Sequence, residues 1–177
     1  MKQLKKLLKL AFVATVVALG MTSCSRDDEP EITSVTDGYT GSFNGSVSLV
    51  IGGQYTYESN ITVTIVKGEN ETITVTLPEY SLPNTLMGDV TLGELTLRNL
   101  VYDAERKGFS LNYGGEGVMQ YFKAVRNGNV TMDADYPLNT PSDIFVTLDG
   151  NGKITVENSF KLGAMPLPLV ESFAGTK

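Results

Sequence analysis

The sequence contains no histidine and no tryptophan, and it has a single cysteine, Cys24, among its 177 residues. Without histidine, the commonest general base, the commonest metal ligand and the usual partner of a serine or cysteine nucleophile are absent. One cysteine can form neither a zinc site of the Cys and His type nor a disulfide within the chain. The composition therefore predicts a protein that is not an enzyme, holds no metal or cofactor, and depends on its own core for stability.

The first 23 residues have the three parts of a secretory signal. Four lysines between residues 2 and 9 precede an apolar run over residues 10–19, and small residues follow it. The apolar run is shorter than the roughly 20 residues that cross a bilayer as a helix. Met21-Thr22-Ser23-Cys24 resembles the lipobox of bacterial lipoproteins, which implies cleavage before Cys24 and lipid attachment to its thiol. We therefore expect a signal peptide over residues 1–23 and a membrane partner through the lipid on Cys24.

Residues 24–37 are expected to be a lipidated, flexible tether, because they are polar and lack periodicity. The acidic run Asp27-Asp28-Glu29 is similar to the signal that sends some Gram-negative lipoproteins to the outer face of the outer membrane. The predicted location is thus the outer membrane, and exposure at the cell surface is preferred over the alternative that the acidic run is only part of a hydrophilic tether and does not set which face carries the protein. The mature chain would carry 10 basic and 20 acidic residues, a net charge of −10, which disfavours nucleic acid as a partner.

From Gly38 onward, apolar and polar residues alternate with the period of a β-strand. Many of the alternating residues are Val, Ile and Thr, which sheets favour. The apolar members of the clearest runs form one predicted inward face, the candidate site for a small apolar ligand: Val47, Leu49, Ile61, Val63, Ile65, Ile73, Val75, Ile144, Val146, Ile154 and Val156.

Turn sequences separate these runs, as at Gly52-Gly53 and Asp149-Gly150-Asn151-Gly152. About eight to ten strands in meander order are expected over residues 38–177, with strands near 90–101, 118–125, 130–135 and 144–148. A closed antiparallel up-and-down barrel of about eight strands is preferred over a Greek-key sandwich, because closure removes both sheet edges. A transmembrane barrel is disfavoured, because the outer faces are rich in threonine and aromatic residues are few.

Three segments carry a resemblance to a known family: Tyr39-Thr40-Gly41-Ser42-Phe43-Asn44-Gly45, Leu86-Met87-Gly88-Asp89-Val90, and Met165-Pro166-Leu167-Pro168-Leu169. They resemble the calycin-like β-barrel domains of secreted bacterial lipoproteins. This resemblance implies an eight-stranded barrel related to the lipocalins, which often hold a small apolar ligand. The lipocalin Gly-x-Trp signature is absent, so ligand binding in that manner rests on analogy.

Two functions follow from this fold. The first is non-catalytic binding of a small hydrophobic ligand inside the barrel. The second is a filled barrel that acts at the cell surface as a structural or interaction domain for a protein or glycan. Among possible catalytic groups, Asp133 and Asp135 lie on one face of a strand, as a glycosidase pair could. We expect them instead to line a solvated face.

Overall fold

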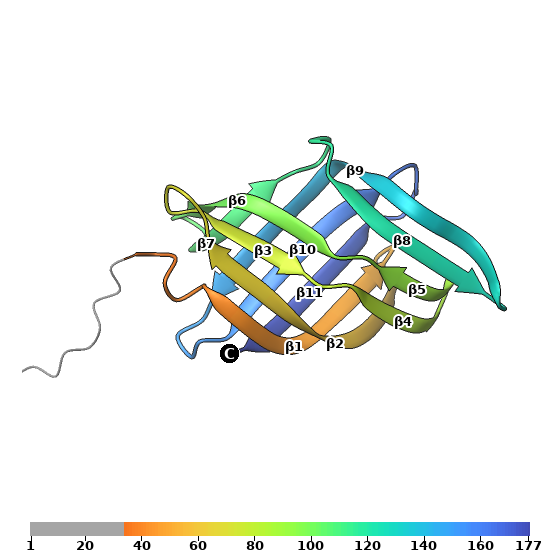
Figure 1. Ribbon diagram of the computed structural model, residues 1–177, viewed down its shortest axis with the longest axis horizontal. Helices are drawn as coiled ribbons and strands as arrows, with labels where there is room; N and C mark the ends of the chain where they lie inside the picture. The colour runs from red at the N-terminus through yellow and green to blue at the C-terminus, as the bar shows by residue number, and fades with distance from the viewer. Residues whose placement is uncertain (1–33) are drawn as a thin grey trace, which may run out of the picture. The chain divides into compact units, whose positions relative to one another are not determined.

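The computed structural model describes residues 34–177, so the predicted signal peptide and most of the predicted tether lie outside the described residues. The described part is all β (Figure 1). No helix long and apolar enough to span a membrane occurs among residues 34–177. The strands are β1 (Gly41–Ile51), β2 (Tyr55–Lys67), β3 (Ile73–Leu77), β4 (Tyr80–Thr85), β5 (Gly88–Leu92), β6 (Leu95–Asp103), β7 (Gly108–Asn112), β8 (Met119–Arg126), β9 (Asn129–Leu148), β10 (Ile154–Leu162) and β11 (Leu169–Thr176).

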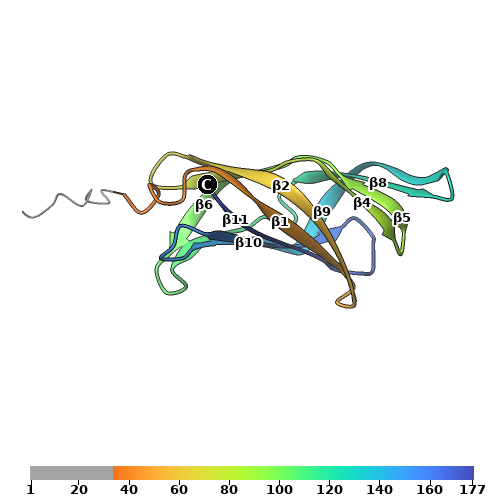
Figure 2. The same ribbon diagram turned by 90° about the horizontal axis from the view of Figure 1, so that it is seen from below.

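Eight strands form a closed antiparallel barrel, which confirms the predicted fold class. The hydrogen-bonded order is β1, β2, β3, β6, β7, β9, β10 and β11. The ring closes because β11 pairs with β1 and because β10 pairs with both β9 and β11. Seen at right angles in Figure 2, the strands lie in two layers that cross at an angle.

The other three strands continue members of the barrel wall. Strand β4 follows β3 after Pro78-Glu79, β5 precedes β6 across Gly93-Glu94, and β8 follows β7 after a loop at residues 113–118. They pair in the same order as the strands they extend: β4 with β5, β5 with β8, and β8 with the first half of β9. The wall is therefore a single up-and-down meander in which three long strands are interrupted.

Strand β9 differs from the sequence prediction. Residues 130–135 and 144–148 were expected to be separate strands, but they belong to one strand of 20 residues. Its first half pairs with β8, and its second half pairs with β7 and β10. The alternation is weak in the middle of this strand because Pro137 and Pro141 interrupt it, so the pattern hides the continuity. Strand β4 was not predicted, because Pro83 breaks its apolar pattern.

The barrel interior is filled by large side chains. All eleven residues of the predicted inward face are buried, with at most 8% of their surface exposed. The largest fully buried side chains are six aromatic rings, which pack with the aliphatic residues in one cluster. An eight-stranded barrel is just wide enough for its own side chains to fill it. The six rings belong to Phe43, Phe109, Tyr113, Phe122, Phe160 and Phe173.

The segment before β1 packs on the barrel near the turn between β2 and β3. Thr36 is fully buried, and the ring of Tyr39 meets Phe109 edge-on with centroids 4.9 Å apart. Lys67 of β2 donates to the Ser34 hydroxyl at 3.1 Å and forms an ion pair of 3.1 Å with Glu71. These contacts fix the point where the preceding chain joins the barrel.

Candidate functional site

A seam in the barrel wall lies between two consecutive members of the meander, β2 and β4. Strands β2 and β3 pair from Thr64 opposite Thr76 to Lys67 opposite Ile73. That register, continued, would place Tyr80 opposite Asn60. Beyond Leu77 the chain turns away instead, and within residues 34–177 no strand pairs with β2 on this side before Thr64. Pro78 lies at the point of divergence, where its missing N–H removes a ladder donor.

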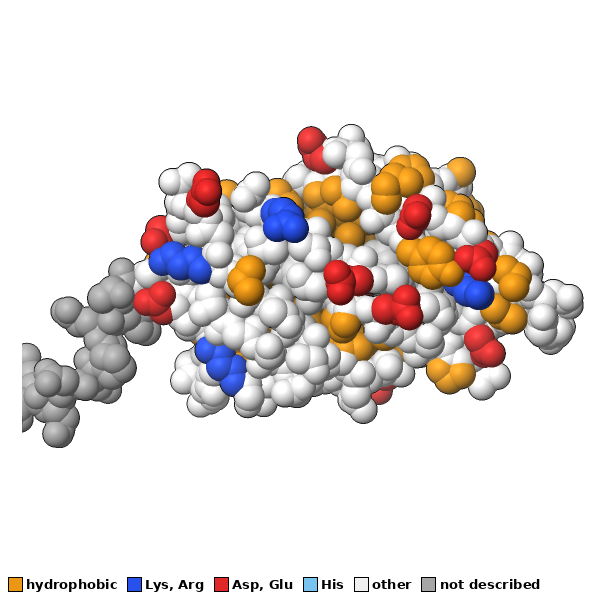
Figure 3. All heavy atoms as spheres, viewed as in Figure 1, with side chains coloured by type: hydrophobic (Ala, Val, Ile, Leu, Met, Phe, Trp, Pro, Cys, Tyr) orange, Lys and Arg blue, Asp and Glu red, His pale blue; other side chains and the backbone are white. Residues whose placement is uncertain are grey.

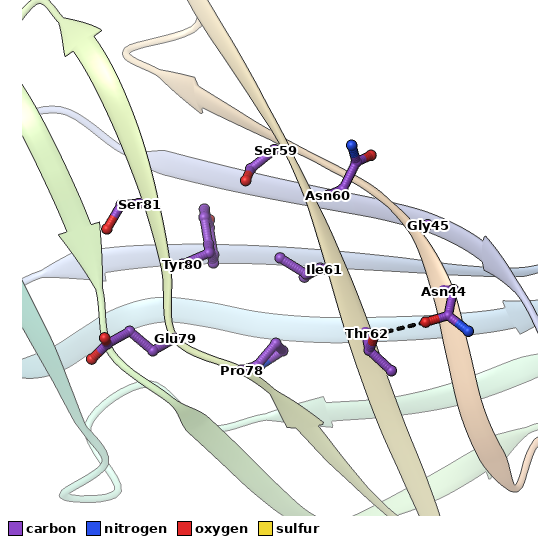
Figure 4. Close-up of a pocket in the computed structure, with 10 residues that line it drawn as sticks. All are labelled: Asn44, Gly45, Ser59, Asn60, Ile61, Thr62, Pro78, Glu79, Tyr80 and Ser81. Atoms are coloured by element: carbon purple, nitrogen blue, oxygen red, sulfur yellow. Dashed lines mark hydrogen bonds between the residues drawn. The ribbon is translucent and has the colours of Figure 1, made fainter.

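A groove of about 780 Å³ lies in this seam. It is open to solvent and has a lining of amides, hydroxyls and one carboxylate around the partly apolar floor of Ile61 and Tyr80 (Figure 4). A second groove of about 510 Å³ continues along the same two strands, from Thr56-Tyr57-Glu58 to Leu82-Pro83. The first groove is lined by Asn44, Gly45, Ser59, Asn60, Ile61, Thr62, Pro78, Glu79, Tyr80 and Ser81.

Hydrogen bonds bound the seam at its two ends. At one end the β2–β3 ladder begins at Thr64. At the other end the backbone N–H of Leu86 donates to the hydroxyl of Tyr57 at 2.8 Å. Between Tyr57 and Thr64, β2 is about 24 Å long at roughly 3.4 Å per residue.

The backbone of β2 presents unpaired groups to the seam. The hydroxyl of Ser46 on β1 donates to the carbonyl of Ser59 at 3.4 Å, so this carbonyl points toward β1. In a strand, the N–H and C=O of one residue point to the same side, and successive residues alternate. The backbone groups of Thr56, Glu58, Asn60 and Thr62 therefore point away from β1, into the seam.

The opposite edge, on β4, is a poorer donor. The N–H of Gly93 donates to the carbonyl of Tyr121 on β8 at 2.9 Å, so by alternation the backbone groups of Leu92 and Val90 point toward β4. The backbone groups of their partners Tyr80 and Leu82 therefore point toward β5. The seam side of β4 is then formed by Glu79, Ser81 and Pro83. Because proline has no N–H, the β4 edge lacks one of its donors.

A chain of buried polar side chains lies behind the groove, inside the barrel. The Tyr113 hydroxyl donates to Oδ1 of Asn158 at 2.5 Å, and Nδ2 of Asn158 donates to Oε2 of Glu171 at 2.9 Å. Asn158 and Glu171 come from the neighbouring strands β10 and β11 and have at most 3% of their surface exposed. The Tyr80 hydroxyl faces the same carboxyl closely enough to act on its pKa, but it makes no hydrogen bond of regular geometry.

The surroundings of Glu171 favour its neutral form. Burial raises the pKa of this carboxyl, and the interactions with Asn158 and Tyr80 oppose the rise only in part. Burial, together with the nearby Glu171 carboxyl, also raises the pKa of the Tyr80 and Tyr113 hydroxyls. A protonated Glu171 can donate to a hydroxyl oxygen, which the ionised form cannot.

The sequence matches the family described as the calycin-like β-barrel domain over residues 36–176. The chain belongs to this family. No curated protein matches the chain. Among solved structures, a candidate outer membrane protein from Bacteroides fragilis is similar in fold, with a TM-score of 0.52 and 19% sequence identity. The match covers 81% of this chain and 52% of that protein, so the chain spans about half the length of its structural neighbour.

In the structure of this calycin-like chain, the predicted site residues lie in different surroundings or outside the described residues. Cys24 lies outside the described residues, so its lipidation stays a prediction. The predicted inward face is buried as expected, but it packs against other side chains of the barrel, and its role in ligand binding stays a prediction. Asp133 is exposed and accepts from the Tyr121 hydroxyl at 2.7 Å, beside an ion pair of 3.3 Å with Lys123. Asp133 and Asp135 thus lie on a solvated face.

The turn at Asp149 is also explained locally. Its carboxylate accepts from the backbone N–H groups of Asn151 and Lys153 at 2.8 and 2.9 Å, which holds the β9–β10 hairpin turn. These hydrogen bonds lower the pKa of Asp149. Across residues 34–177, no group of three or more potential ligand side chains is placed to hold a metal ion.

Sequence reasoning missed Glu171 and Asn158, although the alternation contains a signal for both. Glu171 lies between Leu169 and Phe173, and Asn158 between Val156 and Phe160, so each occupies an inward position of its strand. A polar residue at an inward position must find a partner inside the barrel. The seam could not be found in this way, because it depends on how β4 diverges in space.

Proposed function

We propose that this chain is a lipid-anchored, non-catalytic binding protein of the cell envelope, and that it binds its partner in the β2–β4 seam on the outside of a filled barrel. The observation that carries this proposal is the contrast between the interior and the wall. The interior is packed with aromatic and aliphatic side chains, whereas the groove of about 780 Å³ opens on the wall. A pocket of a few hundred Å³ with several convergent polar groups is typical of a binding site.

The position of the groove supports this assignment. The chain joins the barrel at Ser34–Tyr39, beside the β2–β3 turn, and the seam runs from Thr62 toward the opposite end of β2 (Figure 1). A lipid on Cys24 would therefore tether the chain through the end of the barrel at which residues 34–39 join it, and the seam leads away from that end.

Envelope location is supported by the lipobox-like sequence at Cys24 and by the description of the structural neighbour as a candidate outer membrane protein. The scattered acidic side chains on the face in Figure 3 agree with exposure to solvent. Hydrophobic side chains on this face gather over the end of the barrel that carries β5 and β8.

The test is native mass spectrometry of the protein purified from its own host in its lipidated form. We expect the mass of the chain from Cys24 onward plus its acyl groups, with no further small molecule at any charge state. An unmodified cysteine would refute the anchor. A stoichiometric lipid that persists after the acyl-cysteine mass is subtracted would refute the filled barrel, and would favour a small apolar ligand in the interior.

A further inference from the structure

The β2 edge in the seam has the geometry of a docking site for another strand. Four residues in alternation, Thr56, Glu58, Asn60 and Thr62, direct both backbone N–H and C=O into the groove, and no strand of residues 34–177 pairs with them there. Unpaired strand edges are templates for further pairing, and proteins commonly cover or blunt them. In this barrel the β4 edge is blunted by Pro83, while the facing part of β2 contains no proline.

The charges along the seam restrict which strand would fit. Glu58 and Glu79 line the two grooves, and among the described residues that line either groove none is Lys or Arg. The remaining groups are hydroxyls, amides, aliphatic side chains and the rings of Tyr57 and Tyr80. An incoming strand with cationic ends and with small or β-branched residues between them would complement this lining.

We infer that the seam binds an extended peptide segment of a partner protein, which adds as a strand to the β2 edge, with basic side chains beside Glu58 and Glu79. This inference rests on the proposed function, because it names the partner of the same groove. Main-chain hydrogen bonds supply affinity in this mode of recognition, and the side chains supply specificity. The length available on β2 suits a segment of about five to seven residues.

The first measurement is amide hydrogen exchange of the mature chain with Cys24→Ser, followed residue by residue by NMR. Without any peptide, the amides of Glu58 and Asn60 should exchange rapidly, whereas those of Tyr57 and Ser59 should be protected by the ladder to β1. The alternation is the expected signature of one free edge. Protection of Glu58 and Asn60 in the isolated protein would overturn the inference, and protection that rises with protein concentration would assign the edge to a second copy of the chain.

The probe is a library of blocked heptapeptides with lysine at both ends and with Val, Thr, Ile and Ser varied between them. Binding of a library member should protect the amides of Glu58, Asn60 and Thr62, and leave those of Tyr57 and Ser59 unchanged. N-methylation of the peptide residues whose N–H groups point toward β2 should abolish binding. N-methylation of the residues between them, whose N–H groups point away from β2, should leave binding unchanged. Failure of every member at millimolar concentration would overturn the inference.

Paired variants at Asn60 separate a peptide from a glycan. Asn60→Pro removes the N–H that faces the seam and leaves the ladder to β1 intact, so it should weaken peptide binding by about tenfold or more. Asn60→Ala keeps the backbone and should change affinity by less than about threefold. If Asn60→Ala instead abolishes binding to members of a glycan array while no peptide binds, the groove stands as a binding site but the peptide assignment fails.

The role of the two carboxylates is tested with the double substitution Glu58→Gln and Glu79→Gln. This variant should lose affinity for lysine-ended peptides and keep its affinity for the same peptides ended with glutamine. The difference should shrink at high salt, because exposed ion pairs are screened. Equal losses for both peptide sets would refute the charge assignment. If Asn60→Pro fails to fold by circular dichroism, the N-methylated peptides still test the backbone pairing.

Discussion

Glu171 offers a direct test of the barrel interior, because its carboxyl is buried beside Asn158 and forms no ion pair within residues 34–177. We predict that Glu171→Gln stabilises the protein near neutral pH. The amide keeps an oxygen that accepts from Asn158, and its NH₂ group can donate to the buried Tyr80 hydroxyl, which lacks a regular hydrogen bond. The substitution also removes a group whose ionisation opposes folding.

The size of the effect follows from proton linkage. Burial raises the pKa of Glu171 in the folded state above its ordinary value of 4.5, so the folded chain holds a proton that the unfolded chain releases. The stability from this group is complete below pH 4.5 and falls as pH rises, by about 1.4 kcal/mol per pH unit, until the carboxyl ionises in the fold. The advantage of Glu171→Gln over the wild type should therefore be small at pH 4 and should grow toward that slope above pH 4.5.

The assay is urea unfolding followed by far-ultraviolet circular dichroism, in half-unit steps from pH 4 to pH 8. Glu157→Gln is the matched control, since Glu157 is an exposed carboxylate on β10. Subtracting the control curve removes the general effect of charge. If the curves of wild type and Glu171→Gln stay parallel over the whole range, the carboxyl has an unshifted pKa in the fold and the reasoning is wrong.

Three further predictions concern the core, the wall and the anchor. Phe160→Ala removes a ring that is 1% exposed and should destabilise the barrel by about 3–5 kcal/mol in the same urea assay. Gly45→Ala should also destabilise, because a Cβ there would lie 2.0 Å from the Ala174 carbonyl oxygen, whereas Gly150→Ala, with open space around it, should change little. Cys24→Ala should move the protein from the membrane fraction to the soluble fraction, as shown by immunoblotting after ultracentrifugation. A variant that stays with the membrane would refute lipid anchoring as the attachment.

The sequence was sufficient for the barrel class and for most of its strands, because a barrel of this kind repeats one rule on most of them. Alternation in Val47 to Ile51 or Ile61 to Ile65 identifies an inward face without any knowledge of the neighbouring strand. Glycines mark the β1–β2 turn, where Gly52 and Gly53 adopt φ of +61° and +72°, which residues with a side chain rarely do. Closure then follows from the need to pair both edges.

The candidate site was not predictable from this alternation. It arises where two strands that are distant in the sequence, β2 and β4, fail to pair. Pro78 predicts that a strand is interrupted, but the sequence alone does not show which neighbouring strand loses its pairing partner there. The answer depends on the register of Thr64 with Thr76, after which Glu58, Asn60 and Thr62 have no strand partner on their seam side. Side-chain pairing across the barrel, such as Tyr113 with Asn158, is likewise a property of the closed ring.

The interrupted strands connect the seam to the architecture. Within residues 34–177, the extension formed by β4, β5 and β8 is joined to the rest of the wall by strand pairing only through β9, because β4 does not pair with β2. One edge of the extension is thus held by a continuous ladder, and the other is held by the Tyr57–Leu86 hydrogen bond and by packing around Tyr80. A strand bound along β2 would add backbone hydrogen bonds at the side of the barrel where the ladder lacks them. Binding should therefore slow exchange not only on β2 but also in β4 and β5, and protection confined to β2 would show that the extension does not depend on the seam.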